Sequence, residues 1–205
     1  MNETIKLAIK LFVITAVVAA LLAVVNMVTE PLIEANNERT FNETMSEVLP
    51  EAEEFEEVDV EITPEDDAVA VDSVYAGRSG GDVVGYVVTA VCSEGYGGDI
   101  TVMTGINSDF TVNKAEVTEM DETPGLGTKA QGEWIDQFQG LSEDIEVDKN
   151  GSAETDNKVE AISGATITSR AVTKAVNESI KSAEESAALA EDSSSNINNG
   201  AEEDE

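Results

Sequence analysis

The run Ser163-Gly164-Ala165-Thr166 combines hydroxyl groups with a glycine, directly before a segment of helical spacing. The first backbone N–H groups of a helix have no intrahelical partner, and the helix dipole adds positive potential there. Both effects favour a phosphate at that position. The plain alternative is an ordinary turn in which Thr168 caps the helix. This run therefore predicts a phosphate site or a capped turn, and the rest of the chain must decide between them.

The element that must position this run is the segment that follows it. An apolar face at helical spacing predicts a closing helix that packs on a sheet, with its start near Thr166 pointing at the phosphate. Arg170 or Lys158 is a candidate counter-charge for that phosphate, and each is equally consistent with a surface residue. The apolar positions of the helix are Val172, Val176, Ile180 and Ala183.

The same run, with the acidic Glu160 three positions ahead of it, carries a family resemblance. It resembles the flavinylation motif of the FMN-binding domains in G subunits of Rnf electron-transport complexes. The C subunit of Na+-translocating NADH:quinone reductase has a similar motif. The resemblance implies FMN bound covalently to Thr166 through a phosphoester, with Thr168 as the competing attachment site. The family usually has Asp where this chain has Glu160, which bears on recognition by the flavin transferase.

A second stretch, Glu122-Thr123-Pro124-Gly125-Leu126-Gly127, resembles a loop of the same family residue for residue. Pro124-Gly125 favours a tight turn, and Gly127 permits close approach of the backbone to a ligand. Alone, this would be an ordinary Pro-Gly turn. Gly95–Gly98 and Trp134–Gly140 follow the family order as well, so the resemblance covers residues 83–180. It places these residues at the cofactor: Tyr96, Glu122, Thr123, Gly125, Leu126, Gly127, Thr128, Ser163, Gly164, Ala165, Thr166 and Thr168.

Composition excludes several classes of function. The 205 residues include 43 Asp and Glu against 11 Lys and Arg, for a formal net charge of -32. Such a charge repels nucleic acid, so no DNA or RNA partner is expected. The absence of His excludes His-based metal sites and triads, and the single Cys92 cannot form an internal disulfide or a CxxC site. We expect no metal site and no catalytic residue, so any redox chemistry must come from a cofactor.

A membrane anchor is predicted near the N-terminus. The run Leu11–Thr29 is uncharged and close to the length of about 20 residues that crosses a bilayer. Lys6 and Lys10 precede it and acidic residues follow, so the N-terminus is expected in the cytoplasm and the remainder outside. A cleaved signal peptide is the alternative, but the apolar run is long and no small-x-small site follows it. A new helix is expected to begin at Pro31 and to end before Pro50.

The rest of the chain predicts an α+β fold. Successive apolar runs over residues 69–117, separated by turn residues, indicate antiparallel strands, with Ile100, Val102, Thr104 and Ile106 on one face. The predicted fold is a single N-terminal transmembrane helix followed by an FMN-binding domain, whose mostly antiparallel sheet is packed by helices. The predicted organisation is a cytoplasmic N-terminus (1–10), a transmembrane helix (11–29), a helical and acidic connector (30–68), the FMN-binding domain (69–183) and an acidic disordered tail (184–205).

The resemblance implies a function through its cofactor. FMN would relay electrons within an Rnf-type complex that couples ferredoxin oxidation to Na+ or H+ translocation. The partners implied are membrane and iron–sulfur subunits of that complex and, during maturation, a flavin transferase. Two alternatives remain open: a stand-alone extracytoplasmic flavoprotein electron carrier, and an acidic membrane-anchored scaffold without flavin.

Overall fold

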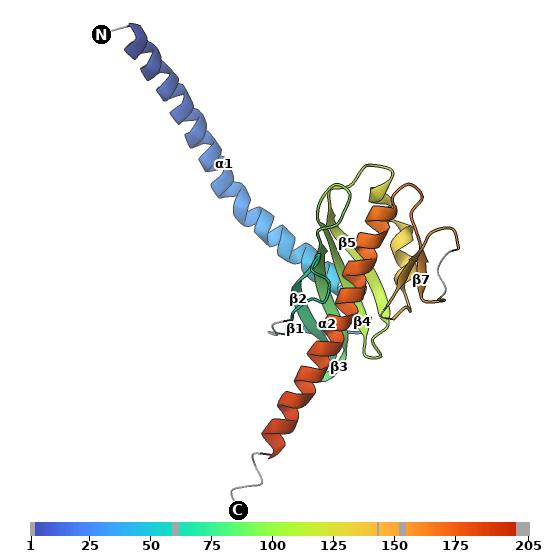
Figure 1. Cartoon of the computed structure of the whole chain (residues 1–205). Coiled ribbons are helices and arrows are strands. Elements are labelled where there is room, and N and C mark those ends of the chain that lie inside the picture. The colour runs from blue at the N-terminus through green and yellow to red at the C-terminus, as the bar shows by residue number, and fades with distance from the viewer. Residues whose placement is uncertain (1–2, 59–61, 143, 152–154, 200–205) are drawn as a thin grey trace, which may run out of the picture. The chain divides into compact units, whose positions relative to one another are not determined.

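The computed structural model describes residues 3–58, 62–142, 144–151 and 155–199, with the side chains of 191–199 excepted. The chain divides into two compact units, Met1–Glu43 and Thr44–Glu205. The elements, shown in Figure 1, are α1 (Glu3–Val48), β1 (Glu54–Glu57), β2 (Val69–Ser79), β3 (Asp82–Cys92), β4 (Ile100–Asn107), β5 (Val112–Met120), the 3₁₀ helices η1 (Gly127–Gln131) and η2 (Glu133–Phe138), β6 (Glu146–Asp148), β7 (Lys158–Glu160) and α2 (Thr166–Asn199).

The helix α1 is apolar and long enough, by length and composition, to cross a membrane. Every described side chain from Glu3 to Thr40 is exposed. The expectation of a separate helix beginning at Pro31 is wrong, because α1 continues through this residue. Proline has a helical φ and removes one backbone hydrogen bond, which a long helix can tolerate.

The predicted α+β fold is confirmed. Strands β1 to β5 form one antiparallel sheet in chain order, and β6 pairs with β7 in a separate parallel sheet. The helix α2 crosses one face of the large sheet, as Figure 1 shows, and packs mostly on β3 and β4. The start of α2 is thereby fixed relative to the strand ends.

The main core lies between the sheet and α2, and strand alternation decides which side chains enter it. Ile100, Val102, Thr104 and Ile106 of β4 are all fully buried, which confirms the predicted face. From α2 the apolar face contributes the positions predicted for the closing helix, and η2 adds Phe138. Burial of these side chains is the chief stabilising contribution to the domain.

The opposite face of the sheet receives the end of α1. Val48 and Leu49 are fully buried there, and a Cβ on Gly105 would overlap the carbonyl oxygen of Val48. Asn113 Nδ2 donates to that same oxygen at 2.7 Å, which satisfies a carbonyl group at the helix end. The domain therefore begins at Thr44 rather than at residue 69 as predicted.

The expected connector and tail also differ from the structure. Part of the acidic connector forms β1, which pairs with β2 at the edge of the sheet. The segment 184–199 belongs to α2 instead of a disordered tail, because its alanines favour helix and Ser186 is still buried. Residues 59–61 of the connector and 200–205 of the tail lie outside the described residues.

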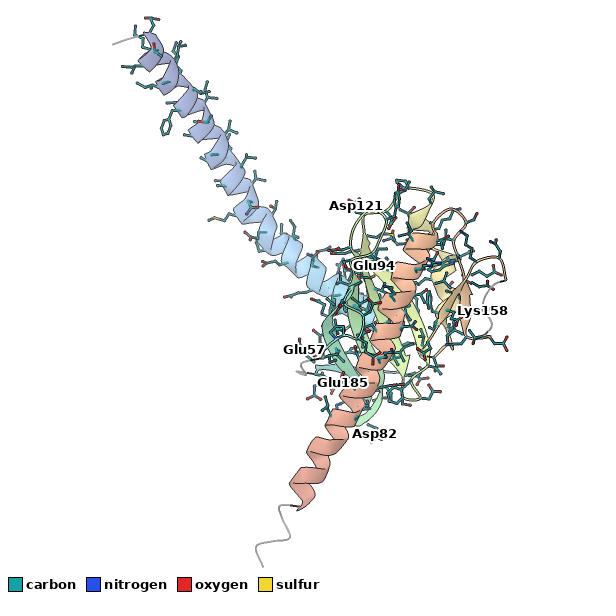
Figure 2. The ribbon with its side chains drawn as sticks, viewed as in Figure 1. Glu57, Asp82, Glu94, Asp121, Lys158 and Glu185 are labelled. Atoms are coloured by element: carbon teal, nitrogen blue, oxygen red, sulfur yellow. The ribbon has the colours of Figure 1, made fainter. Side chains whose placement is uncertain are left out.

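Ion pairs attach the connector to α2. Lys174 Nζ lies 2.9 Å from Asp66 Oδ2 and 2.8 Å from Glu94 Oε2. The hydrogen bond from Lys174 lowers the pKa of the Asp66 carboxyl. Figure 2 shows the labelled acidic side chains Glu57, Glu94 and Glu185 at separate places on the domain, in keeping with its large negative charge.

The contact between Gly105 and Val48 gives a stability prediction. Gly105→Ala should lower the free energy of unfolding by about 1–3 kcal/mol, because the added methyl group overlaps backbone at a packed surface. Gly132→Ala is the matched control, since its Cβ would meet only Lys129 O at 3.5 Å. Denaturant unfolding of the full chain in detergent measures both. Equal stability of the two variants would show that the end of α1 does not pack on the sheet as described.

Candidate functional site

The loop before α2 has the geometry of an anion site. Gly164 has a φ of +83°, in the left-handed region that favours glycine, and the amide of Ala165 donates to Ile162 O at 2.9 Å. The helix then begins at Thr166. The first amides of α2 have no intrahelical acceptor and point out of its start. This is the arrangement that binds phosphate groups at helix N-termini.

Ser169 holds this loop in place. Its Oγ accepts a hydrogen bond from the amide of Ile162 at 2.9 Å and donates to Ala165 O at 3.0 Å. The side chain is fully buried. One hydroxyl therefore connects both ends of the loop to the first turn of the helix. The sequence pattern did not indicate this role of Ser169.

The segment before the loop is fixed by η2. Trp134 Nε1 donates to Glu160 O at 2.6 Å, and the amide of Glu160 donates to Gln137 Oε1 at 2.9 Å. The carboxylate of Glu160 is exposed and, among the described residues, has no hydrogen bond or ion pair. Its backbone thus serves the fold, while its side chain remains available to another molecule.

Glu122 joins the two glycine-containing loops that face the start of α2. Its Oε1 accepts hydrogen bonds from the amides of Tyr96 at 2.7 Å and Gly97 at 3.4 Å. A Cβ on Gly127 would lie 2.6 Å from Glu122 Oε2, so only glycine allows the buried carboxylate to sit there. Glu122 is therefore a positioning residue for these loops. Thr128 supports the same turn through its Oγ1, which accepts from the amide of Gly125 at 2.9 Å.

These loops enclose a cavity of about 490 Å³ with the start of α2. The size is within the usual range for a small-molecule site. The structure brings nine of the predicted site residues together here: Tyr96, Glu122, Thr123, Leu126, Gly127, Gly164, Ala165, Thr166 and Thr168. Gly125 and Thr128 do not line this cavity, and Ser163 lines a neighbouring one.

Two further residues line the cavity that the sequence did not indicate, Ile167 and Lys149. Lys149 follows a strand of three residues that has no periodic signal of its own. The proposed counter-charges lie elsewhere: Lys158 pairs with Asp148 at 3.0 Å, and Arg170 lines neither this cavity nor its neighbour. The carboxylate of Asp148 already neutralises the positive charge of Lys158, which is therefore not available to a phosphate.

Thr168 adds a buried hydroxyl to the lining of the cavity, a status it shares with Ser73, Thr89 and Thr104 of the sheet. Its side chain is 1% exposed, and Oγ1 has no hydrogen-bond partner among the described residues. It does not cap the helix, because α2 already begins at Thr166. A buried hydroxyl without a partner costs about 1–3 kcal/mol, which a ligand oxygen in the cavity would offset.

The rim of the same cavity is apolar. Tyr96, Leu126 and Ile167 are 69%, 42% and 52% exposed. In the described part of the domain only two other large apolar side chains, Val83 and Leu189, are classed as exposed. Exposed apolar groups gathered around one cavity mark a binding site. The site therefore fits a ligand whose anionic end lies at the start of α2 and whose flat apolar body lies against the rim.

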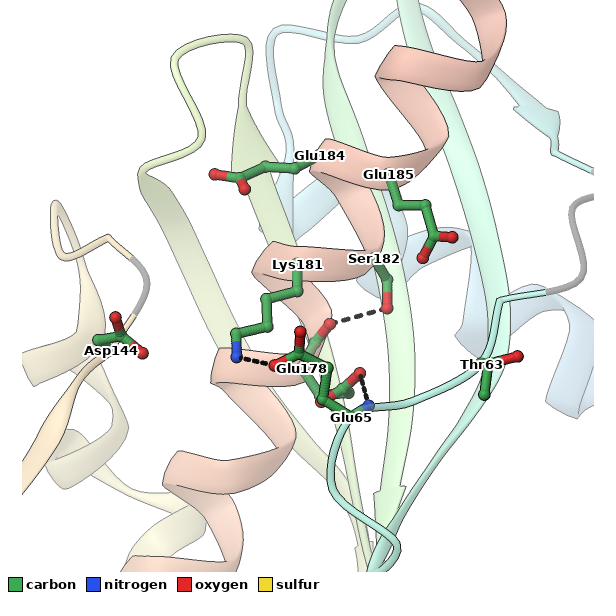
Figure 3. A pocket seen from close by; sticks show the side chains of 8 residues that line it. All are labelled: Thr63, Glu65, Asp144, Glu178, Lys181, Ser182, Glu184 and Glu185. Carbon is green, nitrogen blue, oxygen red and sulfur yellow. Dashed lines mark hydrogen bonds and ion pairs between the residues drawn. The ribbon is translucent and has the colours of Figure 1, made fainter.

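A second hollow on the domain does not suit an anion. Figure 3 shows it, about 360 Å³ in volume and lined by five carboxylate side chains and one lysine, Lys181. That lysine is already bound to Glu65 at 2.6 Å, and Glu178 Oε1 accepts from the amide of Glu65 at 3.0 Å. The charge there is strongly negative. The site at Thr166 is therefore the better candidate for a phosphate.

Known proteins share this domain and much of the remaining chain. Residues 95–181 match the FMN-binding domain family, a range that contains every residue lining the cavity at Thr166. The chain is 44% identical over 185 residues to the G subunit of the Na(+)-translocating ferredoxin:NAD(+) oxidoreductase complex of Acetobacterium woodii, covering 86% of this chain and 89% of the relative. The chain belongs to the family of Rnf-type G subunits.

Two other similarities accompany this assignment. The G subunit of the proton-translocating ferredoxin:NAD(+) oxidoreductase complex of Clostridium ljungdahlii is 33% identical over 144 residues, covering 68% of this chain and 70% of the relative. The crystal structure of Shewanella oneidensis NqrC aligns with a TM-score of 0.47 at 27% identity, covering 57% of this chain and 61% of that one. The predicted relationship of the chain to Rnf-type G subunits is confirmed by its identity to them, and the apolar α1 fits a membrane protein.

The effect of the two Ser169 hydrogen bonds on the loop can be tested by comparison with a matched serine. Ser169 and Ser179 are both fully buried in α2 and both donate to the carbonyl four residues earlier. Only Ser169 also accepts from a loop amide. Ser169→Ala should therefore lower the free energy of unfolding by about 1–3 kcal/mol more than Ser179→Ala. Hydrogen exchange at the Ile162 amide should also rise only in the first variant. Equal losses of unfolding free energy and equal hydrogen exchange in both variants would show that Ser169 does not hold the loop in place.

Proposed function

We propose that this chain carries FMN covalently through a phosphoester to Thr166. The observation that carries the proposal is the contrast between two hydroxyls of one helical turn. Thr166 is half-buried, lines the cavity and stands at the first position of α2, whereas Thr168 is buried. A transferase can reach the first hydroxyl but not the second. Thr168 instead faces the cavity as a hydrogen-bond group.

The covalent step needs an activated donor. The Thr166 hydroxyl loses its proton as its oxygen forms a bond to the FMN phosphorus. A phosphoanhydride bond of the donor breaks, and the group that carried FMN leaves with the electron pair. Relative to free FMN, the protein gains one FMN and loses one water. A flavin transferase is the partner that would supply this donor, with the exposed Glu160 carboxylate free for recognition.

Different residues of the cavity would bind different parts of FMN. The first amides of α2 and Thr168 Oγ1 suit the phosphate, and Tyr96, Leu126 and Ile167 suit the flat ring. When bound, FMN supplies the capacity to accept and release electrons. Cys92, the only cysteine, is buried, and burial raises the pKa of its thiol. Iron–sulfur carriers must therefore belong to other subunits.

The place of the chain in a complex follows from its relatives. We infer that it relays electrons within an Rnf-type complex that couples ferredoxin oxidation to Na+ or H+ translocation, as one subunit among membrane and iron–sulfur partners. Lys6 and Lys10 precede the apolar part of α1, and Glu30 and Glu34 follow it. By the positive-inside rule this favours a single-pass protein with a cytoplasmic N-terminus and an extracytoplasmic FMN domain.

The attachment site is tested with two threonine variants. The full chain is co-expressed with a flavin transferase and examined by in-gel flavin fluorescence after denaturation. Thr166→Ala should lose all covalent fluorescence, because it has no hydroxyl to form the phosphoester. Thr168→Ala should retain it, since Thr168 is buried and serves only as a hydrogen-bond group. Covalent fluorescence in the first variant, or its loss in the second alone, would overturn the assignment to Thr166.

A further inference from the structure

Most basic side chains of the domain are already neutralised. Among the described residues from Thr44 onward, five of the eight are in ion pairs with carboxylates: Arg78, Lys114, Lys158, Lys174 and Lys181. The other three have no carboxylate of a described residue within ion-pair distance: Lys129, Lys149 and Arg170. A domain of this acidity has few cations to offer an anionic ligand, so the position of these three matters.

Only Lys149 of the three lies at the site. It lines the cavity at Tyr96 and also a neighbouring cavity of about 320 Å³ that Ser163 lines. The two cavities have three residues in common, Lys149, Gly164 and Thr166. Lys149 therefore lines both cavities together with Thr166, the residue that would carry the flavin.

Backbone pairing fixes the place of Lys149 in the fold. The preceding residue, Asp148, is the last of β6 and pairs with Glu160 of β7. Its carbonyl accepts from the amide of Ala161 at 2.8 Å. The residue after Asp148 is thereby held next to the segment that leads into Ser163–Thr166. This placement depends on the parallel pair and not on sequence proximity.

The acidic groups around Lys149 have other partners or face solvent. Asp148 is bound to Lys158 at 3.0 Å. Glu122 uses Oε1 to accept from two backbone amides. Glu160 lines the neighbouring cavity with an exposed carboxylate that has no partner among the described residues. No carboxylate of a described residue thus neutralises the ammonium group of Lys149, so this group can pair with an anion at Thr166.

We propose that Lys149 is the cationic partner of the flavin phosphate at Thr166 and that it strengthens the preference of the cavity for FMN over riboflavin. This inference rests on the proposed function. A hydrogen bond between a cation and a phosphate is stronger than one between neutral groups. Thr168 and the helix start would bind the phosphate from the protein side, and Lys149 would bind it from the solvent side. Riboflavin lacks the phosphate and gains nothing from the lysine.

The test compares the two ligands on the same unmodified protein. The full chain is purified in detergent from cells without a flavin transferase, and Kd is measured for FMN and for riboflavin by fluorescence titration. The wild type should bind FMN about tenfold more tightly than riboflavin. Lys149→Gln should lower this ratio severalfold without weakening riboflavin, while the helix start retains a smaller preference for FMN. Lys149→Arg should keep most of the preference, and higher salt should reduce it.

The control is Lys129→Gln, which removes an unpaired lysine that lines neither cavity. It should keep the wild-type ratio. A Lys149→Gln protein with the wild-type ratio would overturn the inference and leave the flavin site itself intact. Equal weakening of both ligands would assign Lys149 a structural role and overturn it as well. A wild type without any preference for FMN would also refute the role of Lys149, whereas the Thr166 variants judge covalent attachment independently.

Discussion

Electrostatic repulsion between an acidic protein and an anionic cofactor is the constraint on which this structure depends. With a net charge of -32, the chain disfavours phosphate over most of its surface. The start of α2 is the exception. There the free amides, the helix dipole, the buried Thr168 hydroxyl and the unpaired Lys149 meet at one point. The carboxylates nearest to it are bonded to amides or to Lys158, as Glu122 and Asp148 are, or point to solvent.

The remaining fold keeps that point rigid. The apolar face of α2 packs on the sheet, and this packing positions its first turn relative to the strands. Hydrogen bonds hold the surrounding segments in place. Ser169 bonds the loop to the helix, and Trp134 of η2 bonds the backbone of Glu160. Glu122 bonds the loop at Tyr96 on the other side of the cavity. Preorganised hydrogen bonds of this kind reduce the conformational entropy that a ligand would otherwise have to offset. A covalent cofactor held on such a frame keeps a constant position for electron exchange.

The sequence predicted the features that are local or periodic. The alternation from Ile100 to Ile106 and the apolar face of α2 are readable from spacing and residue type, whereas the two loop motifs were identified through a family resemblance. Lys149 could not be found in this way, because a parallel pair of three-residue strands brings it to Thr166 from a distant segment. The role of Ser169 depends on its hydrogen bond with the amide of Ile162, and the two residues are brought together by the positive φ of Gly164. The extension of α2 beyond Glu184 was missed because acidic composition outweighed the helix propensity of alanine.

The central claim is that one hydroxyl, that of Thr166, carries the flavin, and a peptide map of the wild-type chain tests it most directly. Trypsin cleaves after Lys158 and Arg170, which isolates the peptide 159–170 with Thr166 and Thr168 both inside it. Tandem mass spectrometry of the loaded protein should show this peptide heavier by one FMN less one water, with the added mass on Thr166. An unmodified peptide, in cells whose transferase loads a related control, or an adduct on Thr168 or Ser163, would contradict the account.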